Sequence, residues 1–381
     1  MGDTRFRVWF GGRAASEEEL ARFEQIEVTQ EMDATWQAEL RLGMCLDEHG
    51  AWLHWPGDSA APFSRVRVEI DIGNGRFAPL IDGPLVGIDA SLDALPGRST
   101  ASMMVRDDSA YLNRDEDSEP PFENRTDSAI AEELFGRFAQ IDSTRIDATD
   151  LTHESVTRRV SVLQFLRARA AQADRHACVL PGDRPGKSIG CFIAEPEGPA
   201  GLPPLVMIGA ARNLANARIE EDPDGAEITV VHSLRVSDQG VTTFEAGAAD
   251  LGLMRDLPAV PADLTPRRAL DPADNLLDSP EAVAQARARR QGYVYLLSGH
   301  VLAGCYGAVL APYLKVRVDA GRTPYSGDYL ITKVVHRITP SVYTQQIEAK
   351  TNSVTAVDAA AVAEALGGGL QLSVSAGGGV F

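Results

Sequence analysis

A short glycine-rich stretch, LPGDRPGKSIGCF at 180–192, carries the residue types of a phosphate-binding loop. A working loop of that kind needs four residues between its first glycine and the Gly-Lys pair, so that backbone N–H groups converge on the phosphates. Here three residues separate Gly182 from Gly186, and the position that the longer spacing requires holds Pro181. Proline supplies no N–H, and Pro185 removes a second donor. The spacing therefore favours a turn between two strands over a nucleotide site.

The same turn would place two cysteines opposite each other. If residues 177–181 pair with residues 188–192, Cys178 and Cys191 lie at equal distances from the centre of the turn. A disulfide between them is compatible with that register, but reduced thiols are expected in a protein made in the cytoplasm. The four cysteines form no Cys-x-x-Cys pair.

No arrangement of residues in the sequence is typical of catalysis or metal binding. The histidines are His49, His54, His153, His176, His232, His300 and His336. None of them pair at the spacing of a helical metal site, and His336 lies in a strand pattern that favours a hydrogen bond within the fold. No Gly-x-Ser-x-Gly motif occurs, and the acidic run at 108–121 is typical of a solvated loop. The sequence therefore predicts no catalytic residues, no cofactor-binding residues, no metal ligands and no cofactor.

The chain is strongly acidic, with a formal net charge of −18 over 381 residues. Nucleic-acid grooves and anionic membranes select for basic patches, so we expect no stable nucleic-acid binding and no membrane insertion. The apolar segment 293–314 is long enough to span a membrane, but Ser298, His300, Pro312 and three glycines interrupt it. This favours two buried strands around a glycine-rich turn. The N-terminal residues lack the apolar core of a signal peptide, so synthesis in the cytoplasm is expected.

Alternating side chains mark the clearest strand of the N-terminal third. In residues 65–72 valines and isoleucines alternate with charged residues, among them Arg67. This is the period of a strand that is buried on one face and solvated on the other. Asn74-Gly75 follows and favours a tight hairpin turn. Residues 1–105 are therefore predicted to form an antiparallel β domain.

Helices are predicted in the middle of the chain. A cap at Thr126 or Asp127 precedes apolar residues at four-residue steps. Ser161 opens a capping box before a second apolar stripe, and a third helix is expected within 279–291. Together with the hairpin described above, the first two helices make residues 106–193 a mixed α/β region.

The two β-rich ends of the chain resemble each other. The motif RVRV at 65–68 matches KVRV at 315–318, and each motif precedes a glycine-bearing turn. A glycine and the start of a later strand are then separated by 16 residues in both copies, at 83–99 and at 327–343. This shared spacing predicts two small barrels or curved sheets of similar plan, with two unrelated β-meanders as the alternative.

Taken in order, these motifs resemble one family. The segments LIDGPLVGIDA, TDSAIAEELFGRF, SVLQFLRARAAQADRHACVLPG and GDYLITKVVHRITPSVYTQQIEAK follow one another in the chain. They are similar to the baseplate hub family of contractile tails, which includes the late control protein D family of phages and the hub half of the type VI secretion spike protein. The resemblance covers residues 60–352. The segments that support the resemblance most are Gln164-Phe165-Leu166 and Gly327-Asp328-Tyr329.

The resemblance implies an α+β fold, mostly β, with two tube-protein-like β-barrel domains and an inserted mixed α/β region. The implied division is 1–105 for the first barrel, 106–193 for the insertion, 194–244 with 306–352 for the second barrel, 245–305 for a connecting helix and strand, and 353–381 for a C-terminal tail that docks on the spike or on a neighbour.

The resemblance also implies a structural protein rather than an enzyme. Three chains with two like barrels each present six similar units, so a homotrimer would adapt a hexameric inner tube to a threefold spike. The expected partners are the inner tube protein, a trimeric spike protein on a separate chain, and baseplate wedge components. The expected location is a virion tail, or an extracellular or cytoplasmic contractile injection particle. The alternatives are a tail-associated cell-wall hydrolase that uses carboxylates of 108–123, and a carbohydrate-binding β protein.

Overall fold

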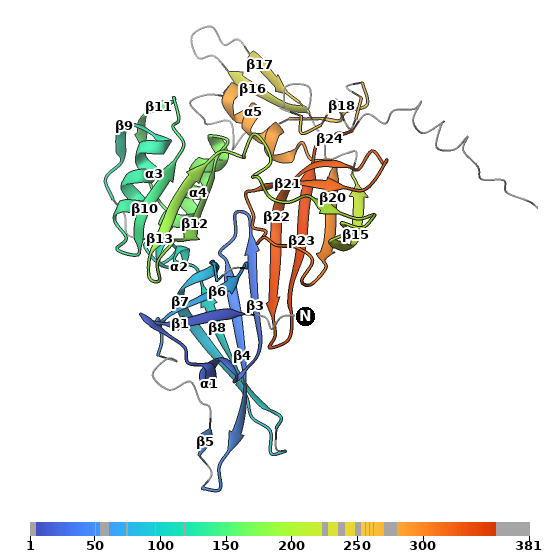
Figure 1. Ribbon diagram of the computed structural model, residues 1–381. Helices are drawn as coiled ribbons and strands as arrows, with labels where there is room; N and C mark the ends of the chain where they lie inside the picture. Colours follow the sequence, from blue (N-terminus) through green and yellow to red (C-terminus); the bar gives the residue numbers. More distant parts are fainter. Residues whose placement is uncertain are drawn as a thin grey trace, which may run out of the picture.

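In the computed structural model, the two β-rich ends of the chain form one sheet, and a mixed α/β domain packs beside it (Figure 1). The structure describes residues 5–355 except 50, 54–60, 74, 96, 117–118, 223–227, 235–240, 248–252, 256, 259, 262 and 270–279. Within these residues the protein is α+β and mostly β, as the sequence predicts.

The N-terminal module, which we define as residues 5–106, is an antiparallel β structure. Its elements are β1 (Phe6–Phe10), β2 (Arg13–Ala14), α1 (Glu17–Leu20), β3 (Phe23–Glu31), β4 (Gln37–Leu46), β5 (Trp52–Leu53), β6 (Arg65–Asp71), β7 (Phe77–Ser91) and β8 (Ser99–Arg106). Strands β6 and β7 form the hairpin that the alternation predicted, with Asp71 opposite Phe77. Asn74 in that turn lies outside the described residues.

The C-terminal module repeats the plan of the N-terminal module. It consists of β14 (Leu205–Val206), β15 (Leu214–Glu221), β20 (Tyr295–Val301), β21 (Lys315–Asp319), β22 (Gly327–Ile338) and β23 (Tyr343–Thr351). The order β15-β20-β23-β22-β21 matches the order β3-β4-β8-β7-β6, and every neighbouring pair in both is antiparallel. The repeat is thus present as a shared topology.

Neither module closes into a barrel within the described residues, so the barrel geometry that we expected is not observed. Instead β3 pairs with residues Lys333 to Ile338 of β22. This is possible because β22 is long. Its first residues pair with β21, and its last six pair with β23 on one side and with β3 on the other. The strand edge that could close one module is used to join the two.

The insertion domain, which we define as residues 107–193, packs its helices on a small sheet. Its elements are α2 (Ser109–Leu112), β9 (Phe122–Thr126), α3 (Asp127–Gly136), β10 (Ile141–Ile146), β11 (Thr152–Val156), α4 (Val162–Gln172), β12 (His176–Pro181) and β13 (Ser188–Ile193). The side chains of Thr126 and Ser161 accept the N–H groups of Ala129 (3.2 Å) and Gln164 (3.3 Å), so both helices begin at the predicted caps. A Cβ on Gly190 would lie 2.6 Å from the Phe135 ring, so this strand position requires glycine.

The β12–β13 hairpin has the register that the sequence predicts. Cys178 lies directly opposite Cys191. Both side chains are buried, and both are free thiols rather than a disulfide.

The remaining elements lie above the C-terminal module in Figure 1. They are β16 (Ile228–Leu234), β17 (Val241–Ala246), β18 (Leu257–Pro258), β19 (Arg267–Ala269), α5 (Pro280–Gln291) and β24 (Ser353–Val354). Helix α5 packs Ala284 and Ala288 against Val231 and Ala246. Residues 356–381 of the predicted tail lie outside the described residues.

The apolar segment 293–314 holds one strand rather than the two that we predicted. After β20 the chain forms turns and irregular backbone up to β21. Gly304 adopts a positive φ of 70°, and Pro312 has no N–H for a sheet ladder, so neither suits a second strand. None of the helices in the described parts of the chain is long and apolar enough to cross a membrane.

Candidate functional site: an interdomain clasp and two sheet edges

The largest fully buried side chain of the described chain is charged. Arg67 of β6 is 2% exposed, although the alternation in residues 65–72 predicted that it faces solvent. Its guanidinium donates to Glu69 (Nε to Oε1, 2.7 Å) and to Asp82 (Nη1 to Oδ2, 3.1 Å). The prediction is wrong because the turn of the β12–β13 hairpin covers this face of β6 and bonds to Arg67.

The glycine-rich loop between β12 and β13 is the partner of Arg67. The carbonyl oxygens of Gly182 and Arg184 accept from Nη1 at 2.7 and 3.2 Å, and the N–H of Gly186 donates to Asp82 Oδ2 (2.9 Å). The loop therefore points two carbonyl groups at a cation and one N–H at a carboxylate, whereas a phosphate loop points several N–H groups at one anion. The stretch is a turn between two strands, as its spacing predicts.

A second arginine, Arg65, also connects the N-terminal module to the insertion domain. Arg65 donates to both oxygens of Asp108 (2.8 and 2.7 Å) and, through Nε, to Asp82 (2.7 Å). Ser188 at the start of β13 also donates to Asp108 (2.7 Å). Burial raises the pKa of Asp108, and the bonds from Arg65 and Ser188 oppose that rise. We call this group the interdomain clasp; its members are Arg65, Arg67, Glu69, Asp82, Asp108, Ser188 and the loop 182–186.

Lys187, the lysine of the apparent phosphate motif, lies outside the clasp. Its ammonium is 3.0 Å from Asp142 Oδ1 at the surface, and its side chain is 44% exposed. Because exposed ion pairs contribute roughly 0 to 1 kcal/mol, Lys187→Ala is expected to change the free energy of unfolding by less than about 1 kcal/mol. Urea denaturation measures this, and calorimetry with ATP tests the site directly. Nucleotide binding that Lys187→Ala abolishes would contradict the assignment of this loop as a turn.

The acidic run at 108–121 is only in part the solvated loop that we predicted. Asp108 is buried in the clasp. Arg158 donates to Glu119 (Nε to Oε1, 2.5 Å) and to Asp115 (3.4 Å), and Arg137 donates to Glu119 as well. Local composition signalled exposure, and Glu116 is exposed, but arginines distant in the sequence bind Asp108, Asp115 and Glu119. Three of the carboxylates that a hydrolase would draw on are therefore bound to arginines.

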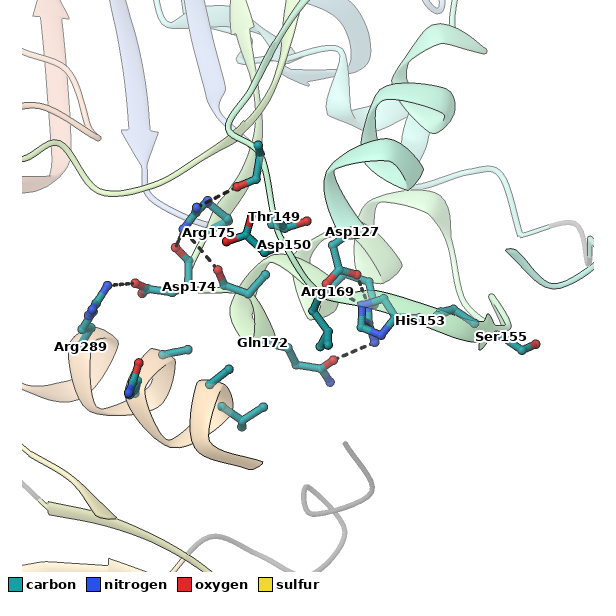
Figure 2. Close-up of a pocket in the computed structure, with 18 of the residues that line it drawn as sticks. Asp127, Thr149, Asp150, His153, Ser155, Arg169, Gln172, Asp174, Arg175 and Arg289 are labelled. Atoms are coloured by element: carbon teal, nitrogen blue, oxygen red, sulfur yellow. Dashed lines mark hydrogen bonds and ion pairs between the residues drawn. The ribbon is translucent and has the colours of Figure 1, made fainter. Parts of the chain in front are cut away.

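A cavity of about 540 Å³ lies between the insertion domain and α5 (Figure 2). On its wall Asp127, the first residue of α3, accepts from Arg169 (2.5 Å) and lies 3.0 Å from Nε2 of His153. On the opposite side Arg289 of α5 donates to Asp174 (2.7 Å). The first set of contacts joins residues within the insertion domain, and the second joins this domain to α5. Across the described residues, no group of three or more His, Cys, Asp or Glu side chains is placed to hold a metal ion.

Both modules carry a β-bulge at the same place in their longest strand. In β7 the register against β8 shifts between Leu85 and Gly87. In β22 the register against β23 shifts between Ile331 and Lys333. Because bulges are specific structural features rather than random defects, Gly87 of β7 corresponds to Lys333 of β22.

A second pair of bulges aligns the first strand of each module. In β3 the register against β4 shifts between Phe23 and Gln25. In β15 the register against β20 shifts between Leu214 and Asn216. Gln25 therefore corresponds to Asn216, and β3 corresponds to β15 residue by residue.

These correspondences identify two strand edges that have no partner strand within the described residues, although the corresponding edges of β22 and β3 pair with each other. Residues 333–338 of β22 pair with β3, and we call this pairing the seam. The matching part of β7, residues 87–91, pairs only with β8 among the described strands. Strand β15, the match of β3, pairs only with β20 in the part of the chain that the structure describes. The chain thus contains one formed seam and two strand edges that correspond to its two sides but have no partner among the described strands.

Comparisons with known proteins find similarity in structure but not in sequence. No protein-family profile matches the chain, and no curated protein matches it. A 43 kDa tail protein of prophage MuSo2 from Shewanella oneidensis has 15% identity and a TM-score of 0.66, covering 91% of this chain and 98% of that one. A tail protein from Neisseria meningitidis MC58 has 14% identity and a TM-score of 0.60, covering 92% and 97%.

A third similar structure comes from a secretion system. It is a type VI secretion component from E. coli, described as structurally similar to the T4 bacteriophage tail proteins gp27 and gp5. It has 12% identity and a TM-score of 0.55, covering 91% of this chain and 77% of that one. The chain therefore has the fold of phage tail proteins and of a type VI secretion component, which is the fold that the resemblance to baseplate hub proteins predicts.

Proposed function

We propose that this protein is a structural baseplate hub, a homotrimer that adapts a sixfold inner tail tube to a threefold spike in a phage tail or contractile injection system. The observation that carries the proposal is the seam between β22 and β3, together with the two edges that correspond to it, residues 87–91 of β7 and strand β15, which are unpaired on that side within the described residues. If residues 87–91 of one chain pair with β15 of the next, every module gains the neighbour that the internal seam already provides. Three chains then contribute six like modules to one ring.

The bulges fix the register of this second seam. In the internal seam Lys333 lies opposite Glu31, and His336 lies opposite Val28. The equivalent pairs are Gly87 opposite Asp222 and Ala90 opposite Ile219 of the neighbouring chain. Because a one-residue slip would turn every side chain to the wrong face, this register is a specific prediction of the proposal.

One end of the N-terminal module suits docking on a tube. The β4–β5 hairpin and the end of the β7–β8 hairpin project from the body of the module at this end (Figure 1). Leu46, Leu53, Leu92 and Leu95 on these projections are exposed. Because both tips lie at one end of the module and carry exposed apolar side chains, we assign them to the contact with the inner tube ring.

Sedimentation equilibrium and electron microscopy of the purified protein test the proposal. The expected mass is three times the 40.9 kDa chain, and the expected image is a ring with six lobes. A stable monomer at high protein concentration would contradict the proposal. A structural role is also supported by the similar structures, two of which are tail proteins, and by the arginine-bound carboxylates of 108–121.

A further inference from the structure

A buried histidine lies where the insertion domain meets both β modules. His176, the first residue of β12, has its side chain 4% exposed. Its Nδ1 lies 2.9 and 3.1 Å from the two carboxylate oxygens of Asp33, in the turn between β3 and β4. On the other side of the ring, Nε2 lies 3.7 Å from Oε1 of Glu195, which follows β13. The imidazole is therefore placed between two carboxylates from different parts of the chain.

Every element around His176 contributes a charged or titratable group. Those groups are Asp33, Glu195, Arg167 of α4, Arg290 of α5, Tyr293, Tyr313 and Lys350 of β23, with Glu31, Lys333 and Glu348 on the wall of an adjoining cavity of about 240 Å³. Arg290 donates to Asp33 (2.6 Å) and to the carbonyl of Arg175 (2.7 Å), and its Nη1 lies 3.5 Å from Nδ1 of His176. Tyr293 donates to Glu195, and the Lys350 ammonium lies 3.8 Å above the Tyr293 ring.

The arrangement distinguishes the two protonation states of the ring. A neutral imidazole has one N–H, so one of the two carboxylates would face a nitrogen lone pair. The imidazolium has two N–H groups and offers one to each carboxylate. Glu195 Oε1 is buried and makes no hydrogen bond in the described residues, and Nε2 of the His176 ring lies 3.7 Å from it. The geometry thus favours the protonated ring.

We propose that His176 is a proton-dependent lock that fixes the insertion domain to the joint between the two β modules. When the ring is charged, it ties Asp33 of the N-terminal module to Glu195, which leads into the C-terminal module. When the ring loses its proton, Glu195 loses its neighbouring cation and Asp33 keeps only Arg290, so β12 and α5 are held less firmly.

The direction of the pH dependence follows from the electrostatics. Burial disfavours the charged ring, but the bond to Asp33 and the attraction of the nearby Glu195 carboxylate outweigh burial and raise the pKa of His176 above its usual value. A group with a raised pKa in the folded state contributes its full stabilisation below its unfolded pKa of about 6.5. That contribution is lost as the pH rises through the folded pKa. The lock is therefore closed in mildly acidic solution and weakens in alkaline solution.

Hydrogen exchange of the full-length protein tests the lock at about pH 6 and about pH 8.5, on either side of the ordinary histidine pKa. After correction for intrinsic exchange rates, peptides that contain β12, α5 and the β3–β4 turn are expected to lose protection at the higher pH. In His176→Gln, which cannot be charged, the same peptides are expected to be equally unprotected at both values. The control is His232→Gln, because His232 is exposed and, among the described residues, its ring is hydrogen-bonded to Thr243 in β17 and to no carboxylate.

Two results would overturn the proposal. One is protection of these peptides that does not change with pH in the wild type. The other is a pH dependence that persists unchanged in His176→Gln. Should that variant not fold, the histidine resonances of the labelled wild-type protein decide the question, because the lock requires one ring that titrates above the ordinary range.

Discussion

Replacing Arg67 with alanine is expected to lower the free energy of unfolding by about 3 to 5 kcal/mol, because it leaves the buried carboxylate of Glu69 without its cation and Asp82 with only Arg65. Glu69 and Asp82 would each lose a charged donor, and the carbonyl of Gly182 would lose the bond at 2.7 Å. None of these groups reaches water easily, since Arg67 and Asp82 are almost completely buried. Urea denaturation followed by circular dichroism measures the change.

Two matched variants separate this effect from a general loss of charge. Arg67→Lys keeps the charge but has no planar fork, so it cannot bind Glu69, Asp82 and the loop together, and an intermediate loss is expected. Arg7→Ala removes an exposed arginine from the neighbouring strand, where it stacks on Phe77, and is expected to cost at most about 1 kcal/mol. If Arg67→Ala cost no more than Arg7→Ala, the clasp would not hold the two domains together.

The double variant Ala217→Pro, Glu221→Pro is expected to abolish the trimer and leave the subunit folded. The N–H of Asp222 bonds to Val294, on the β20 side, so the N–H groups of alternate residues 217, 219 and 221 face away from β20. Proline at two of these positions removes donors from the open edge without breaking the β15–β20 ladder. Sedimentation velocity at micromolar concentration is expected to show a monomer with a wild-type far-ultraviolet spectrum.

The control for this variant is Ala217→Ser, Glu221→Ala. It changes the same side chains, including the carboxylate that binds Tyr325, but keeps every N–H of the edge. It is expected to remain a trimer. A trimer that persists in the proline variant would show that β15 does not form the second seam.

Local features of the fold were predictable because their causes are local. The caps at Thr126 and Ser161 lie three residues before the N–H groups that they accept, and the register of Cys178 opposite Cys191 follows from the turn between them. Each depends on backbone geometry over a few residues. The starts of β8 at Ser99 and of β23 at Tyr343 were also predicted, although the glycines used for the spacing are not equivalent, since Gly83 lies opposite Val66 and Gly327 lies opposite Val318.

The clasp was not predictable, because its partners are distant in the sequence. The alternation around Arg67 shows which side chains share a face of β6, but not that a hairpin 115 residues later covers the charged face. The seam was missed for a related reason. A repeated motif suggested that each copy closes on itself, whereas β22 is long enough to pair with strands on both of its edges.

In the proposed ring, the seam between β22 and β3 joins two modules of the same polypeptide. Two modules on one polypeptide meet at the high effective concentration of a tether, so half of the contacts around the ring form as each chain folds. Only the other half depend on collisions between molecules. The same linkage also frees the two modules to differ in sequence, so that alternate positions around the rim can present different side chains.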